Sequence, residues 1–397
     1  MFKLDFPLLT TQKTVYLDSA ASAQKPEIVL KTMDNFYRTS YANIHRGQCE
    51  IATRATEAYE FARQTVAGFL HTNAQNIVFT KGATESINLV ASGYEHILRP
   101  GDEILICIAE HHADFVPWQQ VCLRTGAKFL TFDVGDDGHI NMDDFRAKLS
   151  SRTRLVAMAQ MSNVLGIVNP VDEIIHLAHK AGSRVLIDGA QGIAHLPVNV
   201  ADMGCDYYTF SGHKIYGPTG IGVLYGTTEA LNAIPPYQFG GDMIKTVSVA
   251  ETTFADVPAR FEAGTPPFVE AIGMAAAINY ISQIGMDKIA IHEKELTQSL
   301  LSELHAVPGM HILGDASDKQ GVVAFHIAGV HPADLAFILA KENICVRVGH
   351  HCAMPIHHRL GYDVSLRVSF GLYNDAKDID IFMQALHKAL SLLGVER

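Results

Sequence analysis

Several features that mark membrane or nucleic-acid-binding proteins are missing from this chain of 397 residues. It has no run of about 18 apolar residues, the length that a membrane-spanning helix requires. It also has no basic run, and 31 basic against 42 acidic residues give a formal net charge of −11. Nucleic-acid binders concentrate positive charge instead. We therefore expect a soluble globular protein that binds neither a membrane nor nucleic acid.

The N-terminal segment lacks a basic region followed by an apolar stretch, because residues 1–6 are MFKLDF. An export signal would need both parts, so we expect a cytoplasmic location. Low-complexity tracts and internal repeats are absent as well. The length and a hydrophobic content of 48% suffice for two domains with sizeable cores.

Lys214 is the most informative single residue. It lies between an aromatic-rich strand candidate, residues 206–210, and a turn rich in glycine, residues 215–220. A lysine forms an imine with a carbonyl when its amine is held in place and can lose its proton, and such surroundings allow both. The alternative is a solvated loop lysine.

A carboxylate upstream supports the first interpretation. Residues 184–188 predict a short buried strand that ends in Asp188, and residues 189–192 are small enough for a ligand to approach. Continuous apolar strands are typical of a parallel sheet covered on both faces, whose ligands bind beyond the carboxyl ends of the strands. In pyridoxal phosphate enzymes an acid at this position pairs with the ring nitrogen. Asp188 could instead cap the next helix.

An anion site is predicted near Thr84. Residues 77–80 predict a strand, residues 81–85 a turn, and residues 86–98 have helical spacing of apolar residues. Free backbone N–H groups and the helix dipole at such a point favour an anion, here a cofactor phosphate. Helix capping alone would also explain Thr84 and Glu85.

His111 and His112 follow a further strand candidate, residues 103–108. A flat imidazole at this strand end could stack on a flat cofactor ring. A surface turn or a pair of metal ligands are the alternatives. Adjacent residues of an extended segment point to opposite sides, so a shared metal is awkward, and one histidine on the cofactor is the easier geometry.

Cys352 is the candidate nucleophile among six cysteines. Cys107 and Cys345 lie in apolar runs, and we interpret them as core residues. Cys352 lies in a Gly/His/Pro loop beside two imidazoles and near Arg347, a setting that favours the thiolate.

The histidines around Cys352 raise a metal-binding alternative. It would involve His350, His351, Cys352, His357 and His358. Recurring zinc sites use two separate clusters of paired ligands, and no second cluster is evident. We therefore expect no metal.

Together these segments resemble fold-type I pyridoxal phosphate enzymes of the class V aminotransferase superfamily. Residues 347–355, RVGHHCAMP, are similar to the active-cysteine signature of group II cysteine desulfurases. The resemblance extends from residues 16–21 to residues 367–369, which is most of the chain.

The resemblance implies an α/β fold with two domains. Residues 20–265 would form a large cofactor-binding domain with a mostly parallel sheet covered by helices. Residues 1–19 and 266–397 would form a smaller α/β domain that carries the Cys352 loop. The active site would then lie between the domains.

The resemblance also assigns roles to the candidate residues. Lys214 would carry pyridoxal 5'-phosphate as an aldimine, and Cys352 would be the catalytic nucleophile. Arg367 would bind the substrate carboxylate by a forked pair of hydrogen bonds, a surface salt bridge being the alternative. The remaining assignments are Asp188 at the ring nitrogen, Gln191 at the ring hydroxyl, His111 as stacked base and proton carrier, Asn163 at the substrate, Thr84, Ser211 and His213 at the phosphate, and Thr265 at the phosphate of a second subunit.

The implied reaction is removal of sulfur from L-cysteine, through a persulfide on Cys352, to give L-alanine. A homodimer and a sulfur-acceptor protein are the implied partners, in iron–sulfur cluster assembly or another route, and some relatives also accept selenocysteine. Two alternatives remain at this point. One is an aminotransferase or kynureninase-type lyase, which would have no use for Cys352, and the other is a non-enzymatic metal-binding protein.

Overall fold

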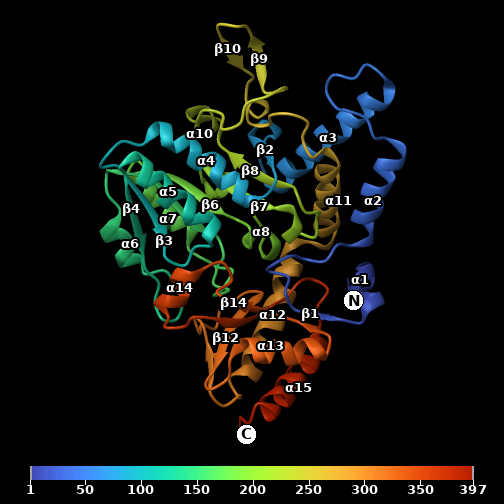
Figure 1. Cartoon of the computed structure of the whole chain (residues 1–397), viewed down its shortest axis with the longest axis vertical. Coiled ribbons are helices and arrows are strands. Elements are labelled where there is room, and N and C mark those ends of the chain that lie inside the picture. Colours follow the sequence, from blue (N-terminus) through green and yellow to red (C-terminus); the bar gives the residue numbers. More distant parts are fainter. Residues whose placement is uncertain (1, 396–397) are drawn as a thin grey trace.

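The computed structural model describes residues 2–395 of the chain. A mixed sheet of seven strands forms the centre of its larger unit (Figure 1). Within these residues β8 alone runs antiparallel to the other strands of this sheet. The strand order is β2 (Ile77–Thr80), β8 (Gly222–Gly226), β7 (Tyr207–Ser211), β6 (Arg184–Asp188), β5 (Thr153–Ala159), β3 (Glu103–Cys107) and β4 (Lys128–Phe132). The predicted mostly parallel sheet is therefore confirmed.

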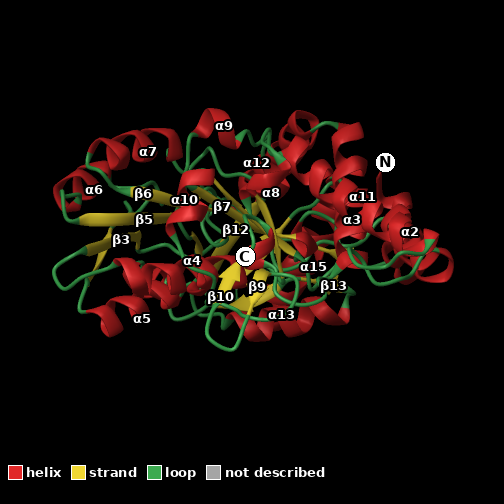
Figure 2. Cartoon of the chain, turned by 90° about the horizontal axis from the view of Figure 1, so that it is seen from above, coloured by secondary structure: helices red, strands yellow, loops and turns green. Residues whose placement is uncertain are grey.

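Both faces of this sheet are covered by helices, which explains the continuous apolar runs of its strands (Figure 2). Side chains that alternate along β2, β3 and β6 belong to two different hydrophobic clusters. On one face they pack against α4 (Ala83–Ile97), α5 (Val116–Thr125) and α10 (Thr228–Ala233). The other face is covered by α3 (Glu50–Phe69), α7 (Val171–Lys180), α8 (Gly192–His195), α9 (Val200–Met203) and α11 (Phe268–Ile284), with α6 (Met142–Lys148) beside β4.

A smaller antiparallel sheet builds a second unit, in orange and red at the bottom of Figure 1. Its order is β11 (Met310–Ile312), β12 (Val322–Ile327), β15 (Ser365–Ser369) and β14 (Arg347–Gly349). The helices of this unit are α12 (Met286–Leu304), α13 (Pro332–Lys341), α14 (Met354–Arg359) and α15 (Ala376–Leu392). Its hydrophobic cluster is separate from the clusters of the large sheet.

The N-terminal segment connects to this second unit. β1 (Val15–Tyr16) pairs in parallel with β13 (Ile344–Cys345), and Val15 and Leu17 join the second unit's cluster. The domain boundary at residue 265 stays a prediction. α11, which follows it, packs on α2 (Glu27–Thr39) and α3, and its apolar side chains join the large sheet's cluster. α1 (Pro7–Gln12) also contributes Leu9 to that cluster.

Shorter elements complete the architecture. A hairpin of β9 (Ile244–Val247) and β10 (Thr252–Phe254) projects from the large unit at the top of Figure 1. The short 3-10 helices are η1 (Phe2–Asp5), η2 (Ala74–Asn76), η3 (His112–Asp114), η4 (Gly212–Lys214) and η5 (Ala259–Phe261). No helix within the described residues has the length and apolar content needed to cross a membrane.

Candidate active site

A cavity of about 180 Å³ lies where the carboxyl ends of the large sheet's strands meet the second unit. Its lining contains every predicted site residue except Thr265. One side, which we call the sheet wall, consists of Thr84, Asp188, Ser211, His213 and Lys214. A second part of the lining, which comes from the smaller unit and which we call the loop wall, consists of Arg347, His351, Cys352 and Arg367. Asn163, Gln191 and His111 complete the lining.

Asp188 is the last residue of β6, and its side chain is buried. The backbone N–H of Ala190 donates to its Oδ1 at 2.8 Å. Burial raises the pKa of Asp188, while the Lys214 ammonium lowers it. A carboxylate in this position would be stabilised by a further cation in the cavity.

Lys214 follows β7 on η4 and faces Asp188 across the strand ends. Burial lowers the pKa of Lys214 to about 8, although Asp188 acts in the opposite direction. A substantial fraction of this amine is therefore neutral near pH 8, as a nucleophilic lysine requires.

The predicted anion site would lie at the start of α4. Ser211 Oγ accepts the N–H of Ala83 at 2.8 Å, which ties the end of β7 to the first turn of the helix. A Cβ on Gly222 would lie 2.3 Å from Gly82 Cα, so these two segments pass too closely for any side chain at Gly222. Thr84 and His213 lie beside this turn in the cavity. Burial, with Lys214 and Lys25 nearby, lowers the pKa of His213 to about 4.

His111 has a defined tautomer. Its Nδ1 accepts the N–H of Ala113 at 3.0 Å, so the proton of the neutral ring is on Nε2. Burial, together with the charge of Lys214, lowers the pKa of His111 to about 3. The ring therefore enters the cavity uncharged, with its free N–H as a donor.

His112 does not line this cavity but holds the cysteine loop instead. Its backbone N–H donates to Cys352 O at 2.6 Å, and its Nε2 accepts the N–H of Met354 at 3.1 Å. The two adjacent histidines thus have separate tasks. In the described residues, no group of three or more His, Cys, Asp or Glu side chains is placed to bind a metal ion.

Arg367 lies on β15 and is only 2% exposed. Its Nη1 donates to Asn163 O at 3.0 Å and its Nη2 to Asp18 Oδ1 at 3.1 Å. Its Nε–H is buried without an acceptor. Leaving a charged donor unpaired is costly, so this atom indicates a missing acidic ligand rather than a surface salt bridge.

The loop that carries Cys352 has an unusual backbone. His351 and Cys352 have φ values of 49° and 57°, a left-handed conformation that costs a non-glycine residue about 1–2 kcal/mol. Asn163 Nδ2 donates to His351 O at 2.7 Å and offsets part of this cost. Cys352 therefore enters the cavity on a turn that contacts from both units hold in place.

Gln191 and Asn163 are in the lining but already use part of their hydrogen-bonding capacity. Gln191 Nε2 donates to Ala20 O at 2.8 Å, and its second N–H is left for a ligand. Asn163 connects His351 O to Arg367, through its side chain and its backbone carbonyl. It is thus a support of the loop wall, in addition to its predicted contact with the substrate.

A pair of buried acidic residues near Asp188 was not identified from the sequence. Glu110 and Asp114 are buried, and burial raises the pKa of each, as does the charge of Asp188. Trp118 Nε1 donates to Asp114 Oδ1 at 2.8 Å. The spacing of four residues between Asp114 and Trp118 was the available signal.

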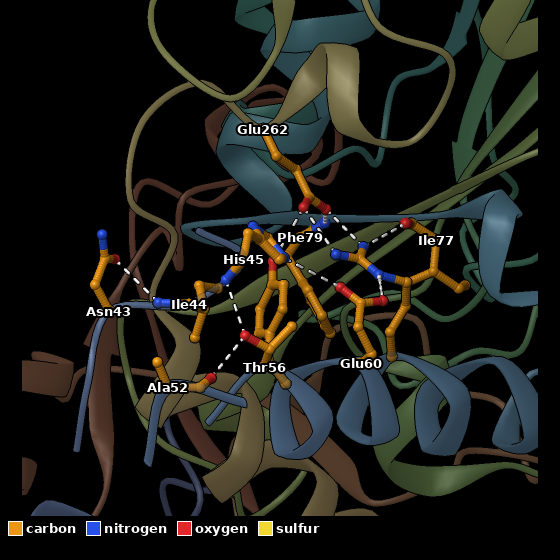
Figure 3. A network of polar contacts seen from close by, with 11 residues as sticks. Asn43, Ile44, His45, Ala52, Thr56, Glu60, Ile77, Phe79 and Glu262 are labelled. Atoms are coloured by element: carbon orange, nitrogen blue, oxygen red, sulfur yellow. Dashed lines mark hydrogen bonds and ion pairs between the residues drawn. The ribbon is translucent and has the colours of Figure 1, made fainter. Parts of the chain in front are cut away.

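Thr265 is exposed and lies outside the cavity. The segment that carries it is anchored through Glu262, whose carboxylate accepts two hydrogen bonds from the Arg63 guanidinium at 2.7 and 2.8 Å. The N–H of Phe79 on β2 donates to the same carboxylate at 2.7 Å (Figure 3). Thr265 is thus held at the surface near the strand that leads to the anion site. Its contact with a second subunit stays a prediction.

Comparisons with known proteins agree with this arrangement. The model of the family described as Aminotransferase class-V matches residues 15–382. A cysteine desulfurase of Dickeya dadantii is 46% identical over 399 residues, which cover 99% of this chain and 97% of that relative. A probable cysteine desulfurase of Mycolicibacterium paratuberculosis is 45% identical over 391 residues, but the chain spans only 57% of its length. The crystal structure of the cysteine desulfurase CsdA from Escherichia coli superposes with a TM-score of 0.92 at 41% identity, covering 98% of both chains.

Proposed function

Because the chain belongs to the aminotransferase class-V family, we propose that it is a pyridoxal phosphate-dependent cysteine desulfurase acting on L-cysteine. One observation carries this proposal. Cys352 shares a single small cavity with Lys214, Asp188 and Arg367. An aminotransferase would need a lysine, an acid and an arginine but would have no use for a thiol on a strained turn.

The residues present fit pyridoxal 5'-phosphate, the cofactor of this family. The start of α4 would receive the phosphate at one end of the cavity, where Gly222 passes too close to Gly82 to carry a side chain. At the end of β6 the cavity offers the buried carboxylate of Asp188, whose pKa is raised by burial. Between them it offers a lysine whose pKa is lowered. A flat molecule with a phosphate, a basic ring nitrogen and an aldehyde matches these three groups.

Each group would have a defined task when the cofactor is bound. The phosphate would lie at the N-terminus of α4 with Thr84, Ser211 and His213, and the ring nitrogen would lie against Asp188. Gln191 would donate to the ring hydroxyl, the His111 ring would cover one face, and Lys214 would hold the aldehyde carbon covalently. The bound ring supplies an electron sink for the substrate α-carbon.

Arg367 would bind the substrate carboxylate. Its unpaired Nε–H needs an anionic acceptor, and a carboxylate beside a guanidinium can accept more than one hydrogen bond. Asn163 would keep the guanidinium in place through its carbonyl. The amino acid would then lie between Arg367 and Lys214, with its side chain toward Cys352.

Cys352 would remove the sulfur. Its thiolate attacks the substrate sulfur, so that an S–S bond forms while the bond between sulfur and Cβ breaks. The substrate carbon keeps the electron pair of the broken bond and takes up a proton. The balanced result is one L-alanine and one persulfide on Cys352 for each L-cysteine.

His111 is a constrained proton carrier. Its Nε2–H can donate into the cavity, but its Nδ1 lone pair is occupied by Ala113 N–H. Because burial lowers its pKa to about 3, the neutral ring is the resting form at neutral pH. We propose that its Nε2–H donates a hydrogen bond into the cavity, and that the ring acts as a proton carrier only when Ala113 N–H releases Nδ1.

Several further properties belong to the same proposal. A homodimer would bring Thr265 of one subunit to the anion site of the other. A protein acceptor would collect the persulfide sulfur, in iron–sulfur cluster assembly or another route. A cytoplasmic location would suit a catalytic thiol, because that compartment keeps cysteines reduced. Use of selenocysteine stays a prediction from the resemblance alone.

The test is a comparison of purified wild type, Cys352→Ala and Cys49→Ala, with L-cysteine and a reductant. Cys49 is exposed and lies far along the chain from the loop wall, so its variant controls for loss of any thiol. We expect equimolar alanine and sulfide from wild type and Cys49→Ala. Cys352→Ala should keep the yellow colour of the bound cofactor, and its rate of sulfide release should fall by at least about 10³-fold.

Two outcomes would contradict the proposal. Yellow proteins that release no sulfide would favour an aminotransferase or lyase. Protein that binds no pyridoxal phosphate would contradict the cofactor assignment itself.

A further inference from the structure

His351, a residue of the cavity lining, has a buried hydrogen-bond acceptor without a partner. Its side chain is only 4% exposed, and it is part of the loop wall beside Cys352. Its Nδ1 is buried without a hydrogen-bond partner. Unpaired buried polar atoms are rare, and one in a cavity wall indicates a group that the ligand must supply.

The proton on His351 can be located from its neighbours. His357 Nδ1 lies 3.0 Å from the Ala353 carbonyl oxygen, which can only accept, so His357 Nδ1 carries a proton. Burial lowers the pKa of His357, so this ring is neutral and its Nε2 is an acceptor. Ser365 Oγ lies 2.9 Å from that Nε2 and therefore donates to it.

The same hydroxyl then determines the tautomer of His351. Having donated its one proton to His357, Ser365 Oγ must accept from His351 Nε2, which lies 3.0 Å away. His351 thus carries its proton on Nε2, and its Nδ1 keeps a free lone pair. Burial and the positive charge of Arg367 lower the pKa of His351 to about 2, so the ring stays neutral and this atom can only accept.

The substrate offers one group that matches this atom. This step depends on the proposed function, with L-cysteine as substrate. Its carboxylate can only accept and is taken by Arg367, while its amine is taken by the cofactor. The thiol is the donor that remains, and its partner must lie near Cys352, the thiolate that attacks it.

We propose that His351 Nδ1 accepts a hydrogen bond from the thiol of bound L-cysteine and so orients the substrate sulfur toward Cys352. The chain of Ala353 O, His357, Ser365 and His351 holds the acceptor in one protonation state. A substrate whose side chain ends in a carboxylate would place a second lone pair against Nδ1 and would bind poorly. His351 is therefore a residue that selects the thiol side chain.

Two variants separate this role from a structural one. His351→Asn keeps an acceptor oxygen near the position of Nδ1 but cannot reach Ser365. His351→Gln reaches the position of Nε2 and Ser365 but removes the acceptor from the cavity. Both are made in a Cys352→Ala holoenzyme, in which sulfur is not removed and equilibrium binding can be measured.

The measurement is the dissociation constant of L-cysteine and of L-alanine, from the change in cofactor absorbance. L-Alanine is the matched ligand without a thiol. In His351→Gln we expect L-cysteine binding to weaken about 3- to 10-fold while L-alanine binding changes less than about 2-fold. His351→Asn should retain L-cysteine binding despite a lower Tm. We therefore expect His351→Asn to have the higher affinity for L-cysteine and His351→Gln to have the higher Tm.

Equal weakening of both ligands in His351→Gln, or full L-cysteine affinity in it, would overturn the inference. A parent protein that responds to L-alanine but not to L-cysteine would also overturn it. A parent that responds to neither, with no sulfide from wild type, would instead show that the proposed function fails. Histidine ¹⁵N NMR of the holoenzyme tests the tautomer directly, since we expect an unprotonated Nδ1 for His351 and an unprotonated Nε2 for His357.

Discussion

The two walls of the cavity are built in opposite ways. The sheet wall carries Asp188, Ser211 and Lys214 at the ends of neighbouring strands and on the short turn that follows, and ladder pairing such as Asp188 with Thr209 sets their spacing. The loop wall carries His351 and Cys352 on a left-handed turn outside any helix or strand. Side-chain contacts such as those of Asn163 and His112 hold it.

This difference suggests that the two walls have different functions. Groups that bind a rigid cofactor need fixed spacing, and strand ends of a buried sheet supply it. The nucleophile is supported by few and separable contacts, and its backbone is strained. We therefore expect substitutions in the sheet wall to affect cofactor binding and chemistry together. Substitutions around the loop wall should affect sulfur transfer while the cofactor stays bound.

The largest effect is expected for Lys214→Ala, in the sheet wall. The covalent anchor of the cofactor would be lost, and activity should fall by at least about 10³-fold with loss of the visible absorbance band. The matched control is Lys319→Met. Lys319 is also buried, with its pKa lowered by burial to about 7, but its Nζ donates to the carbonyl of Leu313 at 2.8 Å, outside the cavity. The control should lower Tm and keep the absorbance.

A smaller effect is expected for Asn163→Ala, which removes the bond to His351 O. Desulfuration should fall about 5-fold, since one hydrogen bond near a strained turn is worth about 1 kcal/mol and its loss misplaces Cys352. Alkylation of Cys352 followed by mass spectrometry should show an altered rate. Asn169→Ala is the control, because Asn169 Nδ2 makes an equivalent buried bond to Ala159 O at 2.7 Å. Equal effects of both variants on Cys352 would contradict the separation of the walls.

Ser365→Ala tests the support behind the loop wall. It removes the hydroxyl that connects His351 and His357, and leaves two buried ring nitrogens unpaired. We expect a loss of about 1–3 kcal/mol in unfolding free energy with the cofactor absorbance unchanged, measured by urea titration. Ser183→Ala removes one buried hydroxyl bond, to Thr153 O at 2.8 Å, and should cost less. A change in cofactor absorbance in Ser365→Ala would show that the walls are coupled.

The smallest effect is on the pH dependence of stability. His351 has a folded pKa of about 2 against an ordinary value near 6.5, so the unfolded chain binds more protons between these values. Its contribution to stability is complete above pH 6.5 and is lost as the pH falls, by at most about 1.4 kcal/mol per pH unit. His351→Gln should flatten the fall in unfolding free energy from pH 6.5 to pH 4.5, whereas His358→Gln, at an exposed position, should not. A steeper fall in His351→Gln would contradict the neutral assignment.

Much of the sheet wall was predictable. Short runs rich in apolar or aromatic residues predicted β2, β6 and β7 and placed Asp188 and Lys214 at one edge. The turn predicted after β2 likewise placed a helix N-terminus near Thr84, and α4 begins at Ala83. These inferences succeed because strand periodicity and burial are local properties of the chain.

The supports of the loop wall were not predictable in the same way. Cys352 could be singled out from its local composition, but the roles of Ser365, His357 and Asp18 come from contacts between distant segments. Asp18 reaches Arg367 across 349 positions of sequence. The acidic pair of Glu110 and Asp114 was missed for a related reason, because only the folded structure shows that both carboxyls are buried near Asp188.

The amino-acid sequence alone determined the family resemblance, the order of strands and helices, and the chemical identity of the lysine, the acid, the arginine and the thiol. The tertiary structure alone decided that these groups share one cavity and that Thr265 lies outside it. It also decided that Nδ1 of His351 is left without a partner while its Nε2 lies against Ser365. The reason is that a residue's type sets which hydrogen bonds it can make, whereas the partners that folding brings within about 3 Å decide which of them it does make.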